Sequence, residues 1–242
     1  MTISKKIIAL FILLLGLSFL GILLGSVLVP FNIDNEIIFK LRIPRTITAI
    51  TAGAGISVAG LLMQTLFRNP LAGPSVLGIS SGSTLGVAIG IFVINTLGIS
   101  SFNEKFSISI LAILGAMAVT FLLLFVSKYL KRSNTLLIVG LMVGYFVSSV
   151  VNVFSFYGDK TDLQSFVYWG LGSFNKEIEY SILWYYYLPI LVLIFLIFLI
   201  QKPLNLLLMG EKYAVSMGLD YKKTRLIIIL IVGLMVGIIT SL

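Results

Sequence analysis

Seven long apolar stretches, separated by short polar connections, dominate the pattern along this chain. The stretches are continuous rather than alternating, which favours membrane-spanning helices over the strands of a barrel. At about 1.5 Å per residue the first six can cross a hydrocarbon core of about 30 Å, and the seventh is barely long enough. The pattern predicts an all-α, polytopic transmembrane bundle that forms a single domain over residues 1–242. The stretches are Ile7–Val29, Ile47–Leu66, Val76–Leu97, Phe106–Ser127, Thr135–Phe156, Ile182–Ile200 and Leu226–Leu242.

A segment rich in Gly, Pro and Ser lies between the second and third stretches. Residues 61–86 read LLMQTLFRNPLAGPSVLGISSGSTLG. Irregular backbone is tolerated at membrane depth only where protein or a watery cavity surrounds it, because lipid cannot satisfy its hydrogen bonds. We therefore expect the polar residues and prolines of this segment to line a central path or its mouth rather than to face lipid. They are Arg68, Asn69, Pro70, Pro74, Ser80, Ser81 and Ser83.

The composition supports a membrane protein and narrows its chemistry. Hydrophobic residues make up 59% of the chain and charged residues 11%, whereas soluble domains have roughly 45–50% and about 25%. The chain has no Cys and no His, which excludes disulfides, thiolate or imidazole metal ligands and the usual proton shuttle. We expect no catalytic, cofactor or metal site. No Gly-Lys-Ser/Thr sequence occurs, so any ATP that drives this protein must bind to another subunit.

The charges indicate the orientation of the bundle. Eleven of the seventeen Lys and Arg residues fall in segments on the same side as the N-terminus, and seven of the nine acidic residues fall on the other side. The positive-inside rule then places the N-terminus in the cytoplasm. The net charge of +8 thus reflects topology and not nucleic-acid binding. The first stretch is longer than the roughly 7–15 apolar residues of a signal peptide, which predicts a retained helix.

Two further patterns concern ion coupling and helix packing. No charged residue lies within the seven stretches, whereas ion-coupled carriers usually place ionisable residues or broken helices at the midplane. Glycines four residues apart recur and predict closely packed helices, without identifying a substrate. These pairs are Gly21/Gly25, Gly78/Gly82, Gly86/Gly90, Gly140/Gly144 and Gly233/Gly237.

Two polar regions outside the stretches are candidate contact surfaces. Residues 202–225, KPLNLLLMGEKYAVSMGLDYKKTR, are long enough for two short cytoplasmic helices, with turns or caps at Gly210 and Gly218. This loop could dock an ATPase or lie on lipid headgroups. On the opposite side, Arg42 and Arg45 precede the second stretch. They could snorkel to headgroups or bind carboxylates of a partner protein.

Several segments, in order along nearly the whole chain, resemble the FecCD/BtuC-type permease family of bacterial ATP-binding-cassette (ABC) importers for iron-siderophore complexes, haem and vitamin B12. They read LRIPRTITAI, AGAGISVAGLLMQTLFRNPLAGPSVLGISSGS, TLLIVGLMVG, YWGLGSF and NLLLMGEKYAVSMGLD. The NPLAGPSVLGISSG block is the most specific of these. Members of that family have about ten spans, so the resemblance implies a type II importer permease that lacks its C-terminal helices.

The resemblance implies roles for particular positions. Arg42 and Arg45 match arginines that accept acidic residues of an extracytoplasmic substrate-binding protein, which favours docking over snorkelling. Residues 202–225 match the cytoplasmic coupling loop that contacts the ATPase. The cytoplasmic gate is matched by Asn69, Leu71, Ser133 and Asn134, and the ATPase-coupling positions by Gly210, Glu211, Ala214 and Gly218.

The implied protein is a non-catalytic permease of the bacterial cytoplasmic membrane. It would pair with a second permease copy, as a homodimer or with a close homologue, and bind two copies of an ATPase and a substrate-binding protein. The implied cargo is a ferric siderophore or haem, with cobalamin as the alternative. An ion-coupled secondary carrier or a passive channel is the alternative from another class. ATPase activity that appears only when a partner subunit is present would support the importer over both alternatives.

Overall fold

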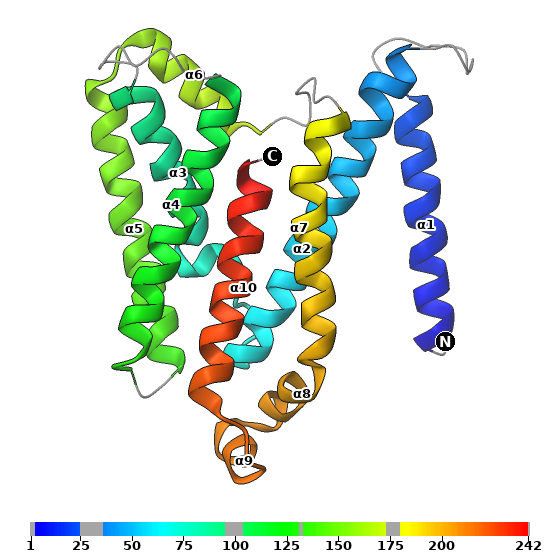
Figure 1. The fold of residues 1–242 in the computed structure, drawn as a ribbon, viewed down its shortest axis with the longest axis vertical. Helices are drawn as coiled ribbons and strands as arrows, with labels where there is room; N and C mark the ends of the chain where they lie inside the picture. Colours follow the sequence, from blue (N-terminus) through cyan, green and yellow to red (C-terminus); the bar gives the residue numbers. More distant parts are fainter. Residues whose placement is uncertain (1–2, 25–35, 95–103, 131–132, 173–179, 242) are drawn as a thin grey trace.

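The computed structural model describes residues 3–24, 36–94, 104–130, 133–172 and 180–241, which form an all-helical bundle (Figure 1). The α-helices are α1 (Ile3–Leu23), α2 (Ile43–Phe67), α3 (Ile79–Ile89), α4 (Glu104–Ser127), α5 (Ser133–Tyr157), α6 (Lys160–Gly170), α7 (Tyr180–Leu199), α8 (Gln201–Met209), α9 (Glu211–Ser216) and α10 (Tyr221–Ser241). Short π- or 3₁₀-helical segments are η1 (Ile38–Arg42), η2 (Pro74–Leu77) and η3 (Gly90–Ile94).

The polar connections divide between the two ends of the bundle. The start of α1, the end of α4, the start of α5, and the short helices α8 and α9 lie at one end, at the bottom of Figure 1. The η1 segment, α6 and the start of α7 lie at the opposite end. This is the grouping that the charge pattern predicts, and we call the two the basic end and the acidic end.

Helix α10 is the centre of the bundle. It packs on α4, α2, α3 and α7, and 61% of its apolar window is buried. In Figure 1 it lies between α4 and α7. Helix α1 differs, since none of its window is buried and it packs on α2 and η1. Its apolar side chains therefore face outward, as expected of a helix surrounded by lipid.

Glycine allows α3 and α4 to touch through their backbones. A Cβ atom at Gly86 would lie 2.0 Å from the Leu111 carbonyl oxygen, and one at Gly115 would lie 2.1 Å from the Gly82 carbonyl oxygen. On α10, Gly233 similarly accommodates Thr120 of α4. The expected close packing of the bundle is confirmed at these contacts, where the absence of side chains lets the helices approach.

The third apolar stretch is not a full-length helix. Its first residues form η2, Gly78 follows with φ +71°, and α3 has 11 residues before the backbone widens into η3. Pro74 and Gly78 set this shape, because the chain uses the start of the stretch to turn back from α2. The sixth stretch forms α7 over almost its whole length, and α7 then meets α8 at a bend of 60°.

The described residues contain five helices that are long and apolar enough to cross a membrane, or six if the bent pair α7–α8 counts as one span. The short α3 region is additional to these. The described part of each of the seven apolar stretches is largely helical, but the third is too short and irregular in its backbone to be a uniform span.

Candidate functional site

The predicted gate loop begins where α2 ends. Arg68 adopts a left-handed conformation with φ 48°, and its N–H donates to the Gln64 carbonyl. The Asn69 side-chain oxygen then accepts a hydrogen bond of 2.9 Å from the Leu71 N–H. This bond closes a tight turn of the kind that Asn favours. Leu71 projects from the turn with 84% of its surface exposed, so it is free to meet another surface.

The second predicted gate layer lies at the start of α5. Ser133 and Asn134 occupy the first turn of that helix, at the basic end of the bundle. Their side chains lie outside the described residues, so their role in a gate stays a prediction.

The predicted coupling loop forms a pair of short helices. Helices α8 and α9 meet at Gly210, which has φ +115°, and α9 is followed by Gly218 with φ +85°. Both values lie in a region that side chains disfavour, which explains glycine at both positions. Ala214 is fully buried and accepts a hydrogen bond of 3.0 Å from the Leu219 N–H. The prediction of two helices with glycine turns is confirmed.

The outer surface of this helical pair combines apolar and charged side chains. Glu211 is exposed at the first turn of α9. Around it, α8, α9 and the residue after α9 expose large apolar side chains, and such patches usually mark a contact with protein or membrane. They are Leu208, Met209, Tyr213, Val215 and Met217. This surface has the chemistry for either of the two occupants that the sequence allows.

The two arginines of the acidic end have different surroundings. Arg42 is 92% buried by accessible area (8% exposed), and its guanidinium donates to the carbonyls of Ile22 and Leu23 at 2.9 and 2.8 Å. These are orphan acceptors at the end of α1. Arg45 is exposed. The structure thus assigns Arg42 a helix-capping contact that the sequence did not suggest, and leaves Arg45 as the accessible member of the pair.

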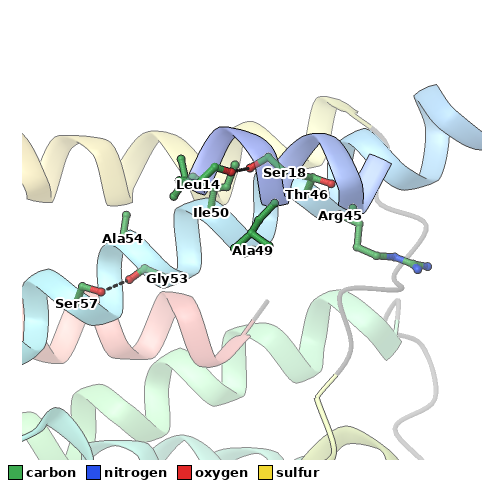
Figure 2. Close-up of a pocket in the computed structure, with 11 residues that line it drawn as sticks. Leu14, Ser18, Arg45, Thr46, Ala49, Ile50, Gly53, Ala54 and Ser57 are labelled. Carbon is green, nitrogen blue, oxygen red and sulfur yellow. Dashed lines mark hydrogen bonds between the residues drawn. The ribbon is translucent and has the colours of Figure 1, made fainter. Parts of the chain in front are cut away.

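A groove of about 650 Å³ runs between α1 and α2 (Figure 2). Small and apolar residues line most of it, and its hydroxyl groups are already used. Ser18 donates to the Leu14 carbonyl and Ser57 to the Gly53 carbonyl, both at 2.7 Å. Arg45 lies at one end and extends away from the helix contact. The groove therefore offers an apolar surface, and not a polar binding site for a soluble substrate.

Four other ionisable side chains that the structure describes at the acidic end are exposed: Glu36, Lys40, Asp159 and Lys160. Lys40 and Glu36 form an ion pair of 2.8 Å one helical turn apart, and the hydrogen bond from Lys40 lowers the pKa of the Glu36 carboxyl. Among the residues that the structure describes, no three Asp, Glu, His or Cys side chains gather into a group that could hold a metal ion.

Sequence reasoning missed one buried charge at the basic end. Arg225 is 3% exposed, and its guanidinium donates to the Ser127 and Leu130 carbonyls at the end of α4. It also lies 5.8 Å from the centre of the Tyr221 ring. Its neighbours Lys222 and Lys223 are exposed. The signal in the sequence was the choice of Arg over Lys, since Arg is better suited to buried, multiple hydrogen bonds.

The fold, with its apolar spans, its exposed turn after α2 and its paired short helices, defines a multi-pass helical membrane protein. Residues 6–242 match the FecCD transport family. The chain belongs to that family.

Named relatives show how far the likeness extends. The molybdate import system permease protein MolB of Haemophilus influenzae is 32% identical over 207 residues, 85% of this chain and 59% of MolB. The vitamin B12 import system permease protein BtuC of Vibrio cholerae is 32% identical over 234 residues, 93% of this chain and 68% of BtuC. A solved inward-facing metal-chelate type ABC transporter superposes with a TM-score of 0.85 at 26% identity, covering 98% of this chain and 75% of that one. Against relatives such as MolB, the chain spans about three fifths of their length.

Proposed function

We propose that this chain is the permease part of a binding-protein-dependent ABC importer in a bacterial cytoplasmic membrane, with its N-terminus in the cytoplasm. Two permease copies would enclose a central path, two ATPase subunits would bind the basic end, and a substrate-binding protein would dock at the acidic end. The chain itself catalyses no reaction. The observation that carries the proposal is the placement of the gate loop and the α8–α9 pair at the same end of the bundle.

The mechanism follows from this placement. A short turn that exposes Leu71 can close a path when it meets its copy in a second subunit, because an apolar constriction excludes water and solutes. A helical pair with an exposed apolar surface can follow a moving ATPase. ATP binding then drives transport only if the ATPase contacts favour one gate state over the other, since a ligand that binds both states equally shifts nothing.

We further propose that Arg45 is a docking contact for the binding protein. Its guanidinium is exposed at the acidic end and can bind a carboxylate through two parallel hydrogen bonds. Arg42 would support this contact indirectly, by fixing the end of α1 beside it. Arg45→Glu should weaken binding-protein association without lowering the thermal stability of the permease, which light-scattering and unfolding measurements can test together.

The proposed cargo is a metal chelate, a ferric siderophore or haem, and cobalamin is the second candidate. The likeness to a metal-chelate type transporter supports the first, and the likeness to vitamin B12 permeases supports the second. The MolB relative adds molybdate to the set to be tested.

Two buried arginines, Arg42 and Arg225, donate hydrogen bonds to backbone carbonyls at helix ends. These bonds argue against their serving as the ion relay of a secondary carrier.

The test is uptake by vesicles that contain the full-length permease, its ATPase and its binding protein. Radiolabelled ferric siderophore, haem, cobalamin and molybdate are offered separately, with ATP inside or absent. ATP-dependent uptake of one of them supports the importer and identifies its cargo. Uptake that persists without the ATPase and follows an ion gradient, or that needs no energy source, would instead establish a carrier or a channel.

A further inference from the structure

Arg68 stands at the junction of the gate loop and α2, in an unusual backbone conformation. Within the described ranges it is the one residue other than glycine with positive φ, at 48°. Bulky residues seldom adopt this left-handed region, and glycine or asparagine usually takes such positions. An arginine here suggests that its side chain has a task that glycine could not perform.

The Arg68 side chain reaches the joint between α8 and α9. A Cβ atom built on Gly210 would lie 3.0 Å from Arg68 Nη1 and 3.6 Å from Cζ. The guanidinium therefore lies against the bare backbone of Gly210, in space that any larger residue would occupy. Gly210 is itself buried and has φ +115°. Two unusual backbone positions, far apart in sequence, thus meet through one side chain.

Each partner of this contact adjoins one of the proposed working parts. Asn69, which follows Arg68, closes the turn that exposes Leu71. Glu211, which follows Gly210, begins α9 and the surface proposed for the ATPase. Helices α2 and α8 also pack on each other beside the contact. A displacement of the α8–α9 joint must therefore move the Arg68 guanidinium or break its contact.

We propose that Arg68 is a positioning residue that transmits movement of the α8–α9 joint to the gate loop through its contact with Gly210. The inference rests on the proposed function and adds to it a specific link. The guanidinium suits this link because it is broad, planar and joined to the loop by a long side chain. The loop suits it because a left-handed residue directly before the turn determines the direction in which the turn projects.

The other interpretation of Arg68 is that it serves only as a positive charge near the lipid headgroups. The two interpretations differ in what Arg68→Gly should do. Glycine adopts the left-handed conformation without strain, so this variant removes the side chain while it preserves the turn. Arg68→Lys keeps the charge and most of the length. Lys128→Ala, at the same end but at the end of α4, is the matched control for losing one exposed positive charge.

The experiment measures gate movement in the full-length permease assembled with its ATPase in lipid nanodiscs. The residues of this chain include no cysteine, so Leu71→Cys introduces a single site for a spin label within it. The distance between the two labels of a permease pair is recorded without nucleotide and with ATP plus vanadate. ATP hydrolysis is measured on the same samples.

We expect the nucleotide-dependent change in label distance to be present with Arg68 and with Lys128→Ala, and partly present in Arg68→Lys. In Arg68→Gly the coupling between nucleotide and gate should fall at least about fivefold, while ATP hydrolysis continues. A purely structural role would instead lower assembly and hydrolysis together with the gate movement. An unchanged distance response in Arg68→Gly would overturn the link and leave the importer intact. Absence of ATPase binding or of any response in the parent protein would overturn the proposed function, and the link with it.

Discussion

The close contact between α3 and α4 predicts that adding a single methyl group at Gly86 destabilises the protein. Replacing Gly86 with Ala places a Cβ 2.0 Å from the Leu111 carbonyl oxygen, a backbone atom that cannot rotate away. The helices must separate by about 1 Å to relieve this overlap. Each pair of atoms that is moved apart by this distance loses about a quarter to a half of its dispersion energy. Overpacking of this kind costs about 1–3 kcal/mol.

A matched control separates this cost from the helix propensity of alanine. Gly53 lies inside α2, and nothing lies within 4 Å of a Cβ built there, because it faces the groove in Figure 2. Gly53→Ala should therefore stabilise the protein by up to about 1 kcal/mol, the usual gain in a helix interior. Since both substitutions carry the same propensity gain, the free energy of unfolding of Gly86→Ala should lie about 1–3 kcal/mol below that of Gly53→Ala.

The assay is reversible unfolding in mixed micelles with increasing dodecyl sulfate, followed by circular dichroism. Both variants are compared with the parent at the same protein and detergent concentration. The reasoning fails if Gly86→Ala unfolds at the same detergent fraction as Gly53→Ala, because the two helices would then tolerate a side chain between them. Gly115→Ala tests the same contact from the other helix.

Three further predictions concern charged groups. Arg225→Met should lower the free energy of unfolding by about 2–3 kcal/mol because charge-assisted hydrogen bonds to α4 are lost, whereas Lys222→Ala on the exposed side of the same turn should change it by less than about 0.5 kcal/mol. Arg42→Met should leave global unfolding nearly unchanged but increase hydrogen exchange in the last turn of α1. Lys40→Ala should raise the pKa of the Glu36 carboxyl, which carbon NMR of labelled Glu can measure. Because this pKa is depressed in the parent protein, the ion pair is intact at neutral pH and is lost as the pH falls through the depressed value.

The sequence predicted the features that depend on local pattern. Continuous apolar stretches determine helices in a membrane because the backbone must satisfy its own hydrogen bonds there, and the described part of each stretch is largely helical. The turns at Gly210 and Gly218 were also predictable, since glycine between short amphipathic segments marks a chain reversal. Both glycines have positive φ in the structure.

Features that depend on contacts between distant segments were not predictable. Gly115 belongs to no glycine pair in the sequence, yet its missing side chain allows the α3–α4 contact because it lies opposite Gly82. The length of α3 could not be read from hydropathy, since η3 continues the apolar stretch and departs from α3 only in its backbone. The contact between Arg68 and Gly210 joins positions whose proximity only the folded chain reveals.

The two buried arginines explain why charge patterns indicate topology better than function. Arg42 and Arg225 lie at opposite ends of the bundle. Arg42 donates to the last two carbonyls of α1, and Arg225 donates to the last carbonyl of α4 and to that of Leu130 just beyond it. A helix C-terminus carries partial negative charge and unpaired acceptors, so a guanidinium is favoured there at either end. Such a residue contributes to the count of positive charges without being available to a partner. Removing one from each end leaves the basic end in excess, so the predicted orientation does not depend on them. The prediction of a docking pair does depend on Arg42, and its burial concentrates that proposed role on Arg45.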